Sequence, residues 1–150
     1  MNEDIQAYIY EHIPIVEKNQ FTIERDEAPY IRVKAHLADH VNHRKTAFGG
    51  SISTSLILCS WASVRSILKA RGIDDGGIVI QTQRVDFSKP VTGDFSARVV
   101  PLREETVNRF IAMLEKFGKG RLKVEARVTQ GSDTASLAHF IGEFVVIRES

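Results

Sequence analysis

Residues 51–64 contain no charged side chain, and this run limits the folds open to the chain more than any other feature. Placed on a helix, it is apolar on all sides, and Gly72 is a natural stop shortly after it. A helix that is apolar all round is buried rather than lying on a surface. The sequence therefore predicts a long central helix, over residues 49–71, that the rest of the chain encloses.

This uncharged run is too short for a membrane-spanning helix. It includes several serines within its 14 residues, whereas a span needs roughly 20 apolar residues. We therefore expect no membrane partner.

Composition places the chain among ordinary globular proteins. With 150 residues, 43% of them hydrophobic, it is expected to form a single domain over residues 1–150. The formal net charge of +1 gives no indication of a nucleic-acid partner. A lone cysteine, Cys59, fits a reducing compartment, and the acidic N-terminal residues do not resemble a secretory signal. These features predict a cytoplasmic location.

Shorter segments on both sides of the central helix show strand or helix periodicity. An amphipathic helix is expected within residues 1–14, ended by Pro14, and a second one from Pro101 to a stop at Gly118. Period-two alternation and turn residues predict strands at 21–24, 30–37, 78–87, 95–100, 121–130 and 134–147, a turn at 74–77 and a β-bulge at Gly142.

Strands joined by short turns pair antiparallel. A sheet with one apolar face and a helix that is apolar all round can bury their apolar surfaces together if the sheet curls around the helix. The predicted fold class is therefore α+β.

The loop before the central helix is polar, cationic and closed by two glycines. Gly49 and Gly50 allow a ligand to approach the backbone closely. The free N–H groups of a helix start can hold an anion or an oxyanion. This stretch is the first candidate for a functional site.

Several motifs in and after this loop match a known family. They are Asn42-His43, Thr46-Ala47-Phe48-Gly49-Gly50-Ser51, Trp61, Ile78-Val79-Ile80-Gln81 and Pro90-Val91-Thr92-Gly93-Asp94-Phe95. The chain resembles, over residues 30–147, hotdog-fold proteins of the thioesterase family named after the C-terminal domain of YiiD. The resemblance implies an antiparallel β-sheet wrapped around a long central helix. It also implies acyl-thioester hydrolysis linked to fatty acid metabolism, at sites between the protomers of a homodimer or homotetramer.

Thioester hydrolysis needs a polarised carbonyl and an activated water. Gly49 and Gly50 are the candidates for holding the oxyanion, and Asn42, His43 and Ser51 for orienting water and thioester. Many hotdog thioesterases carry an acidic residue in the central helix, but this sequence has none between Asp39 and Asp74. A carboxylate from elsewhere, with Asp86 as the best candidate, is the alternative to water held by neutral groups.

No separate cofactor is expected, because coenzyme A or acyl carrier protein would enter as part of the substrate. A metal site at His36, His40 and His43 is disfavoured by their spacing and by the lack of cysteine or paired acidic ligands. Two other functions stay open: hydration or dehydration of an enoyl thioester, and acyl-thioester binding without catalysis. The candidates for substrate binding are Thr46, Phe48, Ser55, Gln81, Arg84 and Lys89.

Overall fold

The computed structural model describes residues 3–74 and 77–148. Part of the predicted turn at 74–77 lies outside the described residues. In chain order the elements are α1 (Ile5–His12), α2 (Pro14–Lys18), β1 (Thr22–Arg25), β2 (Ile31–Ala35), a 3₁₀ turn (Leu37–Asp39), α3 (Gly49–Ala70), β3 (Gly77–Phe87), β4 (Phe95–Val99), α4 (Glu104–Phe117), β5 (Lys119–Gln130) and β6 (Ala138–Ile147).

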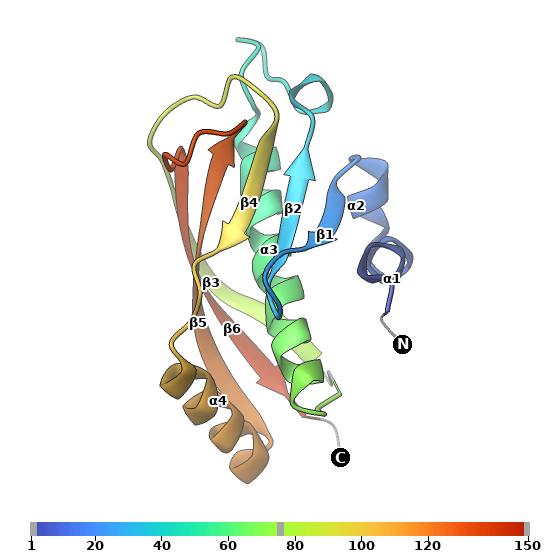
Figure 1. Cartoon of the computed structure of the whole chain (residues 1–150), viewed down its shortest axis with the longest axis vertical. Helices are drawn as coiled ribbons and strands as arrows, with labels where there is room; N and C mark the ends of the chain where they lie inside the picture. The colour runs from blue at the N-terminus through green and yellow to red at the C-terminus, as the bar shows by residue number, and fades with distance from the viewer. Residues whose placement is uncertain (1–2, 75–76, 149–150) are drawn as a thin grey trace.

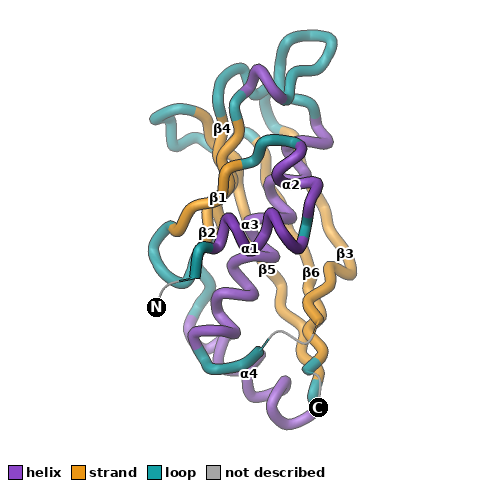
Figure 2. Tube along the Cα trace, turned by 90° about the vertical axis from the view of Figure 1, so that its right-hand side faces the viewer, coloured by secondary structure: helices purple, strands orange, loops and turns teal. Residues whose placement is uncertain are grey.

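In the described residues six strands form one sheet in the order β1-β2-β4-β5-β6-β3, and every neighbouring pair is antiparallel. The sheet curls around α3, while α1 and α2 lie beside β1 at one end of it (Figure 1). This is the α+β hotdog architecture expected from the sequence. In Figure 2, β3 runs along the margin of the molecule, as its terminal place in the strand order requires.

Helix α3 fills the space that the sheet encloses. Leu56, Cys59, Ala62, Val64 and Leu68 are completely buried along it. By length and composition α3 could cross a membrane, but 67% of its apolar window is buried inside the fold. That burial is typical of the core helix of a globular protein.

Several local predictions differ from the structure. The helix expected from Pro101 begins at Glu104, and the strand expected from residue 134 begins at Ala138. Pro14 ends α1 but also begins α2, because proline is well tolerated at the first position of a helix. The predicted bulge at Gly142 was wrong: the register shifts on the neighbouring strand, between Ile80 and Thr82 of β3. A Cβ atom at position 142 would lie 2.4 Å from Cζ of Phe140, so glycine there makes room for a buried ring.

The N-terminal segment is attached to α3 by a cluster of charges. Arg65, whose side chain is only 3% exposed, donates to both carboxylate oxygens of Glu3 at 2.7 and 3.2 Å. Lys69 also contacts that carboxylate, at 3.2 Å, and the Arg65 guanidinium lies 3.6 Å from the ring centroid of Tyr8. Hydrogen bonds from Arg65 are the largest cause of a fall in the Glu3 pKa from 4.5 to about 2.

We expect Glu3→Gln to lower the free energy of unfolding by about 1–2 kcal/mol at pH 7, since it removes the carboxylate charge that accepts two hydrogen bonds from the buried Arg65. The depressed pKa of Glu3 means that its contribution is complete above about pH 4.5 and disappears as the pH falls towards 2. Urea denaturation from pH 7 to pH 2 measures this. The control is Glu11→Gln on the exposed side of α1. Equal stability of the two variants at pH 7 would contradict the assignment.

Candidate active site

The loop before α3 is held in place at three points. The N–H of Phe48 donates to the His40 carbonyl at 2.7 Å, and the N–H of Ala47 donates to the Val91 carbonyl at 2.9 Å. Val41 and Ala47 also form an isolated antiparallel bridge. The start of α3 is therefore anchored both to the loop that precedes it and to the loop at 88–94, which follows β3.

Asn42 holds the turn together from inside. Its Oδ1 accepts from the N–H groups of Arg44 at 2.8 Å and Thr46 at 3.2 Å. Its Nδ2 donates to Oγ1 of Thr46 at 2.9 Å and to the Ala47 carbonyl at 3.4 Å. Both the oxygen and the nitrogen of the Asn42 side chain are thus hydrogen-bonded within the loop. Asn42 therefore fixes the conformation of this loop.

The first turn of α3 presents two backbone N–H groups, those of Gly49 and Gly50, that the helix does not use. The next two residues, Ser51 and Ile52, donate their N–H groups to the Phe48 carbonyl, at 3.0 and 3.1 Å. Within the described residues, the N–H groups of Gly49 and Gly50 have no such acceptor, as expected for the first positions of a helix. The positive end of the helix dipole lies at the same place. Two adjacent donors at a helix start suit an oxyanion.

Two exposed aromatic rings flank these donors. Phe48 is 57% exposed and Phe87 is 54% exposed. A Cβ atom built on Gly50 would lie 2.4 Å from Cε2 of Phe48, whereas one on Gly49 would lie 3.6 Å from Cε1 of Phe87. Glycine at position 50 therefore lets the Phe48 ring fold over the helix start. An apolar surface next to two backbone N–H groups without an acceptor in the described residues suits an acyl group.

Beside the exposed Asp39, the fold brings a second titratable side chain, His40, to this helix start. It is 5% exposed, its ring packs against that of Phe21 at 4.6 Å between centroids with a 30° tilt, and its Nδ1 lies 2.8 Å from Oγ of Ser51. Burial lowers the pKa of His40, an effect larger than the opposing ones of the Asp39 charge and the Asn19 backbone. The imidazole is therefore neutral at pH 7.

The two ring nitrogens of His40 differ in their surroundings. Nε2 is buried and makes no regular hydrogen bond in the part of the chain that the structure describes. Nδ1 faces the Ser51 hydroxyl. If Nε2 carries the proton, Nδ1 is free to accept one from Ser51, and this is the tautomer we assign.

A cavity of about 290 Å³ opens beside this pair. Its walls are Phe48, Gly50, Ser51 and Thr54 on one side and Asn19, Phe21, Asp39 and His40 on the other. His40, Ser51 and Gly50 thus border the same space, and Gly49 precedes Gly50 just outside it. The arrangement can hold a carbonyl group and place a proton acceptor, His40, beside a water that attacks it.

The other predicted catalytic residues lie elsewhere. His43 is exposed in the loop, and it is His40 instead that contacts Ser51. Asp86 is opposite His139 in the β3–β6 ladder, on the sheet face away from α3, and its carboxylate accepts two hydrogen bonds from Arg84 at 3.1 Å. Those bonds lower the pKa of Asp86. Within one protomer Asp86 does not reach the start of α3.

The predicted substrate-binding residues are dispersed. Thr46 and Phe48 belong to the loop and its aromatic flank. Ser55 is completely buried and donates to the Ile52 carbonyl at 2.7 Å, so it faces the core. Gln81 and Arg84 lie on the outward face of the sheet, where Gln81 accepts from Arg121 at 3.0 Å. Lys89 is exposed in the loop at 88–94.

The structure also separates the three histidines considered as metal ligands. His36 contacts Asp94 at 3.2 Å, His40 contacts Ser51, and His43 is exposed. In residues 3–74 and 77–148 no group of three or more His, Cys, Asp or Glu side chains is placed to hold a metal ion.

His40 was not singled out as a catalytic residue from the sequence. Its spacing from Ser51, 11 residues along the chain, matches no local motif. The available signal is its place two residues before the Asn42-His43 motif. Only the folding of the loop back onto α3 distinguishes His40 from its neighbour His43.

Comparison with known proteins agrees with this architecture. A protein of unknown function from Chlorobaculum tepidum TLS superposes with a TM-score of 0.88 at 22% identity, covering 97% of this chain and 93% of that one. A thioesterase described as "putative" from Shewanella oneidensis gives a TM-score of 0.77 at 25% identity, covering 95% and 94%. A "probable thioesterase" from Pseudomonas aeruginosa gives 0.80 at 17% identity, covering 97% and 94%.

The sequence itself matches a family profile over nearly its whole length. Residues 2–148 match the family described as "Putative thioesterase (yiiD_Cterm)". The motifs of the loop and the first turn of α3 lie inside the matched region. The chain therefore belongs to the YiiD C-terminal-domain thioesterase family, with a hotdog fold.

Proposed function

We propose that the protein hydrolyses acyl thioesters at the start of α3. The observation that carries this proposal is the pairing of two free backbone donors, Gly49 and Gly50, with a neutral buried histidine hydrogen-bonded to Ser51. Oxyanion stabilisation and proton transfer are the two requirements of acyl transfer to water.

In the proposed reaction the thioester carbonyl oxygen lies at the amides of Gly49 and Gly50. A water molecule held by the Ser51 hydroxyl attacks the carbonyl carbon. The water gives a proton to Oγ of Ser51 as the serine proton passes to Nδ1 of His40. The tetrahedral intermediate then expels the thiolate, which takes the proton back from His40 through Ser51, leaving a carboxylic acid and a free thiol.

The lack of a carboxylate in the first turns of α3 supports a histidine base. Residues 49–64 contain no acidic residue, and Ser55 is bonded to the helix backbone. Ser51 lies in the first turn of the helix rather than on a Gly-x-Ser-x-Gly turn, which favours water over Ser51 as the nucleophile.

We further propose that two copies pair along β3 in the working enzyme. This strand ends the sheet, so one side of its backbone is open to a partner strand. Val79 and Phe87 on it are 55% and 54% exposed. Pairing here would place both helix starts near the interface and cover the apolar flank of each site.

The coenzyme A or acyl carrier protein part of the substrate would extend out of the site past a cationic loop region. Arg44, Lys45 and Lys89 are exposed in the two loops that meet at Ala47 and Val91. These cations suit the phosphates of coenzyme A or the acidic surface of an acyl carrier protein. The cytoplasm, where these carriers occur, is the location we propose.

The test is release of free thiol from short-, medium- and long-chain acyl-CoA and from acyl carrier protein substrates. We expect turnover with at least one class and a preference among chain lengths. Absorbance loss of a crotonyl thioester without thiol release would instead indicate hydratase activity. Thermal stabilisation by acyl-CoA without any turnover would indicate a binding protein.

A further inference from the structure

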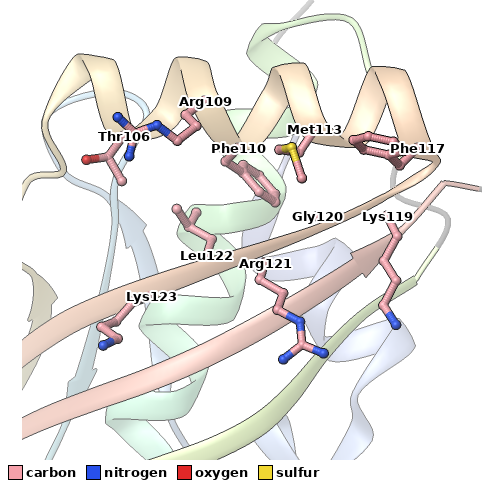
Figure 3. A pocket seen from close by; sticks show the side chains of 10 residues that line it. All are labelled: Thr106, Arg109, Phe110, Met113, Phe117, Lys119, Gly120, Arg121, Leu122 and Lys123. Atoms are coloured by element: carbon pink, nitrogen blue, oxygen red, sulfur yellow. The ribbon is translucent and has the colours of Figure 1, made fainter.

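A second cavity, of about 560 Å³, lies between α4 and the first half of β5. Its apolar lining consists of Phe110, Met113 and Phe117 of α4 and Leu122 of β5. Figure 3 shows Phe110 and Leu122 pointing toward each other between the helix and the strand. The volume is within the range of small-molecule sites, roughly 300–1,000 Å³.

The outer part of this α4–β5 groove is not closed by the fold. Met113 is 46% exposed and Phe117 is 61% exposed, whereas Phe110 and Leu122 are buried. Exposed apolar side chains next to a buried apolar floor can bury further area against an aliphatic chain.

The border of the α4–β5 groove is cationic. Arg109, Lys119 and Lys123 line it, and none of them forms an ion pair within residues 3–74 and 77–148. Arg121 is the exception, since it donates to Glu143 at 3.3 Å and to Gln81 at 3.0 Å. Within the described residues, no carboxylate side chain lines this groove. The groove therefore attracts a negative charge.

Backbone N–H and C=O groups of β5 face the same side. Strand β4 pairs only with residues 126–130 of β5, so the first half of β5 has an open edge. The N–H of Val100 donates to the Glu125 carbonyl on that side at 2.8 Å. Because backbone groups alternate along an antiparallel strand, those of Lys119, Arg121 and Lys123 point to that side too.

We infer that this groove binds an aliphatic carboxylate, with the chain on Phe110, Met113 and Phe117 and the carboxylate at the Lys119–Lys123 edge. Lysines and a covering helix also protect sheet edges from aggregation, but that protection does not require Met113 and Phe117 to be exposed. A second copy is disfavoured as the occupant, because a two-fold contact would bring the same cations together. The inference does not depend on the proposed hydrolysis.

The probe is decanoate below its micelle concentration, with binding to the full chain measured by calorimetry. We expect the double variant Lys119→Glu/Lys123→Glu and the variant Phe117→Ser each to weaken binding at least tenfold. The matched controls are Lys18→Glu and Ile15→Ser on α2, where Ile15 is 56% exposed. Gly49→Pro is expected to keep full affinity, which separates the groove from the site at α3.

Decanol lacks the carboxylate and butyrate lacks the long aliphatic chain, so the two compounds separate the contributions of these groups. Decyl phosphate tests the identity of the anion. We expect decanol and butyrate to bind at least tenfold more weakly than decanoate, and decyl phosphate to bind no more tightly. Decanoate binding that is unchanged in both groove variants would overturn the inference. So would binding to anionic lipid vesicles without binding of monomeric decanoate, which would indicate a membrane contact instead.

Discussion

Gly49→Pro is expected to lower kcat for thioester hydrolysis by about 10²–10³-fold while leaving the helix intact, the usual loss when one oxyanion donor is removed. Proline has no N–H, so the substitution deletes one donor of the proposed pair. Phe48 has φ −64° and ψ 132°, the conformation favoured before proline, and position 49 is the first of α3, where proline is well tolerated.

The matched control is Gly49→Ala, which keeps the N–H. Its Cβ would lie 3.6 Å from the nearest Phe87 atom, an ordinary contact. We therefore expect kcat within a few-fold of the unchanged protein and a similar Tm for both variants. Steady-state kinetics with the best acyl-CoA substrate, together with thermal denaturation, checks this. Equal kcat for proline and alanine would exclude the Gly49 amide from catalysis.

His40→Gln is expected to lower kcat by about 10²–10⁴-fold, the range for losing a general base. Because His40 is buried against Phe21, this variant can also lose stability. Ser51→Ala is the second variant: it removes the hydroxyl that lies 2.8 Å from Nδ1 and leaves the histidine in place. We expect it to lower kcat by at least tenfold at an unchanged Tm.

The control for His40 is His43→Gln, which changes an exposed side chain in the same loop. We expect it to retain kcat. Loss of activity in His43→Gln together with full activity in His40→Gln and Ser51→Ala would reverse the assignment and make His43 the base.

The pH profile gives an independent readout of His40. Burial lowers its pKa below the ordinary value of 6.5. The neutral form, which is the base, is present above that pKa. We therefore expect kcat/KM to be flat near pH 7 and to fall about tenfold per pH unit below the His40 pKa. A profile with its acid limb above pH 6.5 would contradict the buried, neutral histidine.

The fold could be predicted from the sequence because it follows from local patterns. An uncharged run at 51–64 must be buried, and the alternation at 121–130 requires a strand with one buried face. The stop at Gly118 was also predictable, since its φ of 71° suits glycine. Patterns of this kind depend only on near neighbours in the chain, and the glycine pair at the start of α3, Gly49 and Gly50, is one of them.

The partners of that pair could not be predicted in the same way. His40 and His43 are equally plausible bases by residue type, and only the loop geometry brings His40 to Ser51 and leaves His43 exposed. The register of β3, with its shift between Ile80 and Thr82, likewise decides that Asp86 faces away from α3.

The sequence by itself determined the elements, the central helix and the glycine amides at its start, because helix and strand periodicity and the freedom of glycine are local properties. Tertiary structure alone decided which histidine is buried beside Ser51, that Asp86 faces away from α3 of its own protomer, and that a cationic groove opens between α4 and β5. These depend on packing between segments far apart in the chain, and one residue of strand register is enough to move a side chain to the other face of the sheet.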